Sequence, residues 1–218
     1  MQGVFSQVAV MGSSGMLLCA LIVLWRRGVA AYITAFMWQS VVLGALTAAV
    51  GYFGHDPQLY VVAVLLFGIK AVAIPRLLRR VSQRFTAGRE SAPYVNTATS
   101  LVVSGLLVLL AYAAARPLEA VADAPTRAGM PLAMGLLFIS LFIIISRKLA
   151  ITQVIGFLML ENAIALLAVL ATYGVPLIVE LGVFLDALMG FIVMQIFLYD
   201  IHDTFSTTDV DVLKRLKH

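Results

Sequence analysis

The chain has 218 residues, of which 62% are hydrophobic and only 12% carry a charge. Soluble domains average about 45–50% apolar and about 25% charged residues, so this composition excludes a soluble globular enzyme and a disordered chain. The single cysteine, Cys19, excludes a disulfide within the chain and a metal cluster built from thiolates. The net charge is +4, and the basic residues lie between apolar segments. These features describe an integral membrane protein and exclude a nucleic-acid binder.

Apolar segments of spanning length follow one another along the whole chain. A transmembrane helix needs about 20 mostly apolar residues, because it rises about 1.5 Å per residue across a hydrocarbon core of about 30 Å. Membrane strands would be shorter and would alternate apolar and polar residues, which these segments do not. The sequence therefore predicts an all-α membrane protein of about seven helices. In chain order the expected spans are residues 4–25, 28–54, 59–75, 91–115, 128–146, 149–173 and 177–199.

The basic residues predict how the helices are oriented. When the connections are taken alternately, only Arg116 and Arg127 fall on one side, and Lys70 lies inside a span. All other basic residues fall on the opposite side: Arg26, Arg27, Arg76, Arg79, Arg80, Arg84, Arg89, Arg147, Lys148, Lys214, Arg215 and Lys217. Short cytoplasmic loops carry an excess of Lys and Arg, so we expect the N-terminus outside and the C-terminus in the cytoplasm. This basic side is expected to contact anionic lipid headgroups.

The external connections are short, and the longest internal one, about residues 76–93, is expected to be an amphipathic continuation of the third helix. Spans one to three and five to seven also follow a similar plan. A basic pair (Arg26-Arg27, Arg147-Lys148) precedes a long helix, and a Gly/Pro turn precedes the next. This pattern suggests a parallel duplication of three, one and three helices. We accordingly expect an N-terminal three-helix unit at 1–90, a connector helix and external loop at 91–128, and a second three-helix unit with a cytoplasmic tail at 129–218.

Ionisable residues within the spans are the candidate functional groups. Glu161, Asp186 and Lys70 lie deep in their segments, and Glu180 lies one turn from the outer boundary. A charge near the bilayer centre costs at least about 2.5–3.5 kcal/mol, so it normally faces protein or water and serves a function. Glu161, Asp186 and Lys70 are candidates for a proton relay, with Glu180 as an outer access point. Two alternatives stay open: a structural ion pair of Lys70 with Glu161 or Asp186, and a Lys70 side chain that snorkels to the surface.

Other polar groups suggest structural roles. Gln39, Ser40, Asn96 and Gln195 are expected to form hydrogen bonds between helices. His55 and His202 are expected at or beyond the membrane surfaces. The chain has no Cys/His set for haem or iron–sulfur ligation, no glycine-rich phosphate loop and no catalytic triad. We therefore expect no metal site, no catalytic residues and no cofactor in this chain.

Three features together carry a family resemblance: the Trp25-Arg26-Arg27 step, the segment GFLMLEN at 156–162, and the tail at 206–217 with its Asp/Val/Leu pattern. On these features the chain resembles the E component of hydrogenase-4-type and formate-hydrogenlyase-type membrane complexes. Residues 130–218 are also similar to the small K-type subunit of complex I, and to the C subunit of multisubunit sodium/proton antiporters.

The resemblance implies a non-catalytic membrane-arm subunit of a complex-I-related, group 4 [NiFe]-hydrogenase-like assembly in a bacterial or archaeal plasma membrane. Its partners would be antiporter-like membrane subunits and hydrogenase-type peripheral subunits, which would hold the NiFe centre and the iron–sulfur clusters. In K-type subunits two membrane carboxylates on consecutive helices take part in proton translocation or coupling, and Glu161 and Asp186 occupy the matching positions. Asp186 replaces the usual glutamate, and Glu161 is slightly displaced along its helix.

Two other functions stay open at the level of sequence. The chain could be a purely structural scaffold subunit, in which case Glu161→Gln would leave coupling unchanged and substitutions at small residues such as Gly105 or Gly190 would disrupt assembly. It could also be a subunit of a multisubunit cation/proton antiporter. A stand-alone transporter is disfavoured, because the chain is short and has no discontinuous-helix signature.

Overall fold

The computed structural model describes residues 2–26, 28–85, 94–121 and 127–172. All of them belong to one of the two structural units of the chain, residues 1–182. Over the described residues every regular element is helical. In chain order they are α1 (Gln2–Trp25), α2 (Val29–Gly54), α3 (Gln58–Leu65), the π-helix η1 (Leu66–Ala73), α4 (Ile74–Phe85), α5 (Thr97–Val121), the short 3₁₀-helix η2 (Arg127–Gly129), α6 (Met130–Ser146) and α7 (Ala150–Thr172).

Six of the expected spans are confirmed, because six stretches in the described residues are long and apolar enough to cross a membrane. They cover 3–25, 29–54, 58–80, 97–117, 127–146 and 151–171. The expected seventh span, 177–199, lies outside the described residues, as does Gln195. The orientation of the helices, the duplication and the three-part domain division stay predictions.

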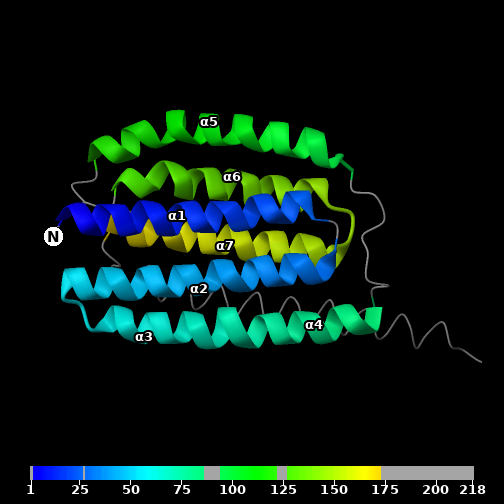
Figure 1. The fold of residues 1–218 in the computed structure, drawn as a ribbon, viewed down its shortest axis with the longest axis horizontal. Coiled ribbons are helices and arrows are strands. Elements are labelled where there is room, and N and C mark those ends of the chain that lie inside the picture. The colour runs from blue at the N-terminus through cyan, green and yellow to red at the C-terminus, as the bar shows by residue number, and fades with distance from the viewer. Residues whose placement is uncertain (1, 27, 86–93, 122–126, 173–218) are drawn as a thin grey trace, which may run out of the picture. The chain divides into compact units, whose positions relative to one another are not determined.

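The helices lie side by side in this unit (Figure 1). Helix α6 packs against α5 on one side and against α7 and α1 on the other. Helix α2 packs against α1 and α7, and also against α3, η1 and α4. Helices α1 and α7 thus lie between the α5–α6 pair and the layer formed by α2 and the α3–η1–α4 helix.

The sequence places two helix boundaries slightly wrongly. The fourth span was expected at 91–115, but α5 begins at Thr97 and continues through Arg116 and Pro117 to Val121. Its start is set by Asn96, whose side-chain oxygen accepts a hydrogen bond from the Thr99 N–H at 2.8 Å. Asn96 therefore caps its own helix, whereas a bond between helices was expected. The expected continuation of the third helix is helical as far as Phe85.

Candidate functional site

The lysine of the third span lies on an unusual turn. Lys70 belongs to the π-helix η1, and the Ile74 N–H donates to the carbonyl of Ile69, five residues earlier. Pro75 follows directly. A proline inside a helix has no N–H, and its ring collides with the carbonyl four residues before it, so a wider turn relieves the contact. Pro75 therefore provides a physical reason for the wide turn that carries Lys70.

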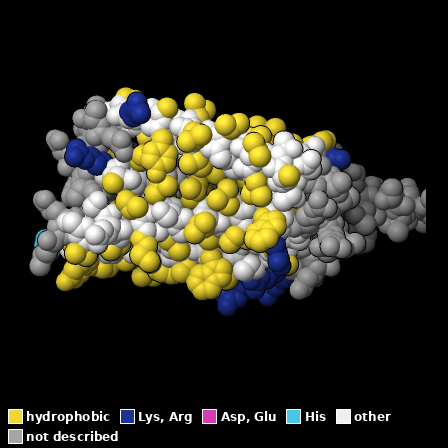
Figure 2. All heavy atoms as spheres, turned by 45° about the horizontal axis from the view of Figure 1, so that its top comes forward, with side chains coloured by type: hydrophobic (Ala, Val, Ile, Leu, Met, Phe, Trp, Pro, Cys, Tyr) yellow, Lys and Arg dark blue, Asp and Glu magenta, His cyan; other side chains and the backbone are white. Residues whose placement is uncertain are grey.

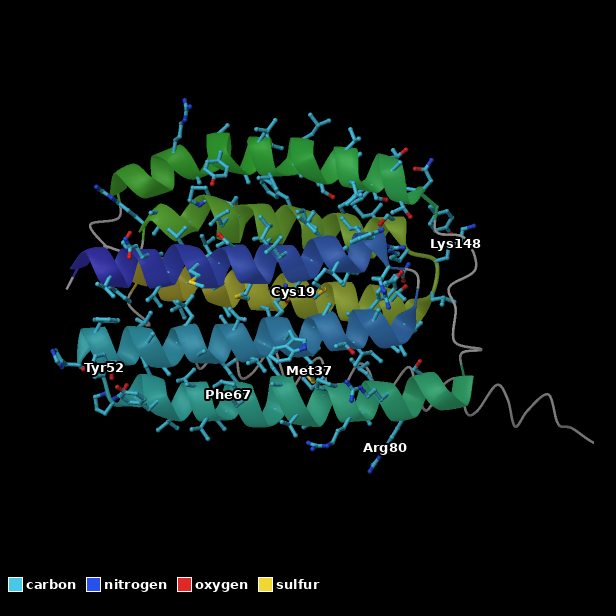
Figure 3. All side chains as sticks on the ribbon, viewed as in Figure 1. Cys19, Met37, Tyr52, Phe67, Arg80 and Lys148 are labelled. Atoms are coloured by element: carbon cyan, nitrogen blue, oxygen red, sulfur yellow. The ribbon has the colours of Figure 1, made fainter. Side chains whose placement is uncertain are left out.

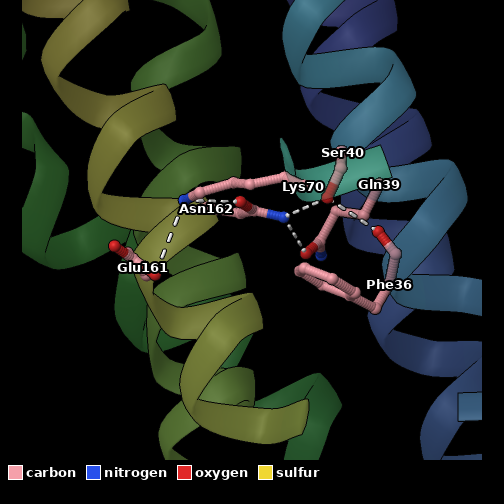
Figure 4. Close-up of polar contacts among 6 residues, drawn as sticks. All are labelled: Phe36, Gln39, Ser40, Lys70, Glu161 and Asn162. Carbon is pink, nitrogen blue, oxygen red and sulfur yellow. Dashed lines mark hydrogen bonds and ion pairs between the residues drawn. The ribbon is translucent and has the colours of Figure 1, made fainter. Parts of the chain in front are cut away.

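Lys70 extends into the protein and does not snorkel. Its side chain is buried, with 1% of the residue exposed. The Lys70 ammonium nitrogen Nζ lies 3.5 Å from Oε2 of Glu161. It also donates a hydrogen bond of 3.2 Å to Oδ1 of Asn162. Two of the three proposed relay residues, 91 positions apart in the chain, are thus brought together as an ion pair (Figure 4).

Asn162 connects this ion pair to helix α2. Its side-chain nitrogen Nδ2 donates to Oε1 of Gln39 at 3.2 Å and to Oγ of Ser40 at 3.1 Å. Gln39 in turn donates from Nε2 to the carbonyl of Met16 on α1 at 3.3 Å. Ser40 donates to the carbonyl of Phe36 at 3.0 Å. The expected role of Gln39 and Ser40 as hydrogen-bonding groups between helices is confirmed.

We call Gln39, Ser40, Lys70, Glu161 and Asn162 the polar cluster. It joins α1, α2, η1 and α7, and all five residues are buried, Glu161 being the most exposed at 4%. Glu161 lies about 16 Å along α7 from its first residue, and Lys70 about 18 Å along its helix from Gln58, at about 1.5 Å per residue. Both positions are near the middle of a hydrocarbon core of about 30 Å. Charges at that depth persist when they are paired and hydrogen-bonded. Here Lys70 and Glu161 are paired, and Lys70 also donates a hydrogen bond to Asn162.

The other two proposed acids, Asp186 and Glu180, lie outside the described residues. Their relation to the polar cluster stays a prediction. His55, expected at a membrane surface, is exposed in the turn after α2.

Sequence reasoning missed a second buried cation. Arg147, expected only as a basic loop residue, is 2% exposed. Its guanidinium donates to the carbonyls of Val23 (2.9 Å) and Leu24 (3.4 Å), which belong to the last turn of α1. It also lies 5.1 Å from the centre of the Tyr32 ring. The last carbonyls of a helix have no partner within the helix, so Arg147 caps α1 from the connection between α6 and α7. Arg147 is buried and Lys148 is exposed, but the sequence does not distinguish them, because they are two adjacent basic residues in the same connection.

These elements define a class: a multi-pass α-helical membrane protein whose core contains an ion pair held by side-chain amides. Comparison with known proteins then gives the family. The chain is 36% identical over 214 residues to the uncharacterized protein Rv0085 of Mycobacterium tuberculosis, covering 98% of this chain and 97% of that protein. The chain therefore belongs to the same family as Rv0085.

A more distant similarity agrees with the resemblance seen in the sequence. The chain is 25% identical to Hydrogenase-4 component E of Escherichia coli (strain K12) over 179 residues, or 82% of this chain and 83% of that protein. The same values hold for Hydrogenase-4 component E of Shigella flexneri. This homology supports a hydrogenase-4-like membrane subunit. No family model matches the chain. No solved structure matches it either.

Proposed function

We propose that the chain is a non-catalytic membrane-arm subunit of a complex-I-like, hydrogenase-type oxidoreductase complex in a bacterial or archaeal plasma membrane. In this proposal the pair Lys70–Glu161 takes part in proton translocation or redox coupling. The observation that carries it is the buried ion pair midway along two membrane helices. The homology to Hydrogenase-4 component E supports membership of such a complex.

The chemistry of the pair suits a proton-handling role. A proton can lie on Nζ of Lys70, which leaves an ammonium beside a carboxylate, or on Oε2 of Glu161, which leaves a neutral amine beside a carboxylic acid. When two ionisable groups interact this closely, a change at either one alters the proton affinity of both. A charge that moves in a neighbouring subunit can therefore shift the proton across the pair. In the same proposal Asp186 is a further relay acid and Glu180 an outer access point.

The proposed partners are antiporter-like membrane subunits, and peripheral subunits that hold the NiFe centre and the iron–sulfur clusters. The basic face of α4 is proposed to contact anionic lipid headgroups, because Arg76, Arg79 and Arg80 are exposed there. Arg80 points away from the neighbouring helices (Figure 3). On the face drawn in Figure 2, hydrophobic side chains cover most of the described surface and the basic side chains lie near its margins.

A structural scaffold is the second candidate function, and the ion pair itself favours it, because the pair holds η1 against α7. Breaking such a pair by removing one partner costs about 3–5 kcal/mol, whereas replacing both partners with groups of similar volume is often neutral. A single substitution would therefore confuse a loss of stability with a loss of function. A double substitution separates the two.

The test is the double variant Lys70→Met with Glu161→Gln in the assembled complex. We expect it to assemble and to keep its redox activity with an artificial electron acceptor. It should lose proton translocation, measured in membrane vesicles with a pH-sensitive dye. Asp56→Asn is the matched control: it removes a carboxylate from the turn after α2, while the new amide oxygen can still accept the hydrogen bond from the Gln58 N–H. Normal proton translocation by the double variant would leave the pair only a structural role.

A further inference from the structure

The direction of each hydrogen bond in the polar cluster follows from its ends. The carbonyls of Met16 and Phe36 can only accept hydrogen bonds. Gln39 must therefore present its Nε2 to Met16, which leaves Oε1 to face Asn162. Asn162 must then present Nδ2 to Gln39 and Ser40, and Oδ1 is left for Lys70. Ser40 accepts from Asn162 and gives its own hydrogen to Phe36.

Among the described residues, the hydrogen bonds from Lys70 through Asn162 to Gln39 and Ser40 are thus all donated away from Lys70, and the two branches end on the main-chain carbonyls of Met16 and Phe36. A group relays a proton only if it can accept one on one side and release one on the other. A primary amide does not do this, because its oxygen is a very weak base and its N–H a very weak acid. The Ser40 hydroxyl is the one group of the three that could do so, and its hydrogen is directed to the Phe36 carbonyl, which passes nothing on.

We infer that Gln39, Ser40 and Asn162 form a hydrogen-bonded layer that conducts no protons, on the α2 side of the Lys70–Glu161 pair. We call this layer the backing. The backing holds Lys70 in place in both protonation states, because an ammonium and a neutral amine can each donate to Oδ1 of Asn162. The proton can therefore move within the pair, from Nζ to Oε2, without any amide turning over. Protons reach and leave the pair on its other side and do not cross toward α2 and α1. This inference rests on the proposed function, since it assigns positioning residues to the same site.

The three residues are fully buried, which favours a backing without water between its members. Their polar atoms are also matched. Both hydrogens of Nδ2 in Asn162 are used, as are Oε1 of Gln39 and the hydroxyl of Ser40. Reversing the Asn162 amide would place two donors together at Lys70 and two acceptors together at Gln39. The arrangement therefore has a single favourable orientation.

Ser40→Ala tests the inference, because a route through α2 would need that hydroxyl. The variant is made in the assembled complex, and the readout is the number of protons translocated per electron transferred, next to the redox rate with an artificial acceptor. We expect Ser40→Ala to lower the rate of proton translocation and the rate of coupled electron transfer together, because Nδ2 of Asn162 loses an acceptor and holds Lys70 less firmly. The number of protons translocated per electron should stay at the wild-type value. Ser104→Ala is the matched control: Ser104 is also buried and donates to the carbonyl four residues earlier, that of Ser100, but lies on α5 away from the cluster.

Two further variants keep the outcomes distinguishable. If Ser40→Ala loses the wild-type proton-to-electron ratio and Ser40→Thr, which restores a hydroxyl, recovers it, the inference that the backing conducts no protons is wrong. The double variant Lys70→Met with Glu161→Gln reports on the proposed function independently. If it still translocates protons, the proposed function fails and the backing fails with it. If the double variant stops translocating protons, and Ser40→Ala loses the ratio while Ser40→Thr recovers it in an assembled, redox-active complex, only the backing fails.

Discussion

Individual side chains decide how this protein keeps charge inside an apolar bundle. Lys70 and Arg147 are both cations with almost no exposed surface, yet they are held differently. Lys70 has a carboxylate and an amide beside it, and Arg147 has main-chain carbonyls and an aromatic ring. A guanidinium is flat and carries several donors in a fixed arrangement, so it can bond two carbonyls and stack on Tyr32 at once.

The first prediction at this scale concerns Arg147. Arg147→Gln removes the charge, the contact with Tyr32 and the bonds to the end of α1. We expect it to lower the free energy of unfolding by about 3 kcal/mol, since hydrogen bonds to charged groups contribute about 1.5–3 kcal/mol and a cation–π contact about 0.5–2. Arg147→Lys should recover only part of this loss. The measurement is the unfolding transition in detergent.

Arg26→Gln serves as the control, because Arg26 is an exposed basic residue at the end of α1. Exposed substitutions of this kind change stability by about 0.5 kcal/mol or less. Equal effects of Arg26→Gln and Arg147→Gln would show that Arg147 does not cap α1.

At the scale of single elements, the turn between α2 and α3 differs from what its residues suggest. Gly54 is the residue most suited to the left-handed conformation that ends many helices. In the structure Gly54 is the last residue of α2, and His55 adopts that conformation instead, with φ 56° and ψ 31°. The His55 N–H donates to the carbonyl of Gly51, and the Asp56 N–H donates to the same carbonyl at 3.1 Å. A non-glycine residue in this conformation costs about 1–2 kcal/mol.

This geometry gives a paired prediction. His55→Gly should stabilise the protein by about 1 kcal/mol, because it removes the strain of the left-handed conformation. Gly54→Ala should stabilise it by about 0.5–1 kcal/mol, because position 54 is helical. Thermal unfolding in detergent measures both. A destabilising Gly54→Ala would mean that Gly54, and not His55, takes the left-handed conformation.

At the scale of the whole bundle, close packing and not the hydrophobic effect drives the association of the membrane helices. Lipid tails are as apolar as the side chains, so membrane helices associate through small residues that let backbones approach. A Cβ added at Gly156 would lie 3.0 Å from side-chain carbons of Ile143 and Ile144, and 3.2 Å from the backbone nitrogen of Ile144. Gly156 thus permits the contact between α6 and α7. Around Gly105 on α5, no atom of the described residues lies within 4 Å of such a Cβ, apart from its chain neighbours and the backbone of its own helix.

We therefore predict opposite outcomes for two identical substitutions. Gly156→Ala should destabilise the chain by about 1–3 kcal/mol, because the backbone of α6 cannot move aside cheaply. Gly105→Ala should be neutral or should stabilise α5 by up to about 1 kcal/mol. The unfolding transition of the purified chain is the measurement. If Gly105→Ala is tolerated in the purified chain but prevents assembly of the complex, a partner subunit packs on that face of α5.

The orientation in the membrane is also a property of the whole chain. Arg147 contacts the end of α1, so the connection from α6 to α7 lies at the opposite end of the bundle from the turn after α2. Lys148 and Tyr52 mark these two ends in Figure 3. In a Cys19→Ala background, we expect Lys148→Cys to react with a membrane-impermeant thiol reagent only from the cytoplasmic side, and His55→Cys only from outside. The reverse pattern would contradict the positive-inside assignment.

Composition and hydropathy by themselves determined the class of protein and six helical spans, because spanning length and lack of charge are local properties of the chain. The sequence also singled out Lys70 and Glu161, since a charged residue within an apolar segment can be recognised without knowing which residue it pairs with. It left open whether Lys70 snorkels or pairs, because a lysine stem can do either.

Tertiary structure decided the pairing. Two partners of Lys70, Glu161 and Asn162, come from α7. Asn162 and Gln39 meet only because α2 and α7 pack side by side. The burial of Arg147 depends on the same packing. So does the difference between Gly105, where an added side chain has room, and Gly156, where it does not. Contacts between segments far apart in the chain depend on which helix faces meet. That choice is made by packing across the whole bundle, and no local pattern records it.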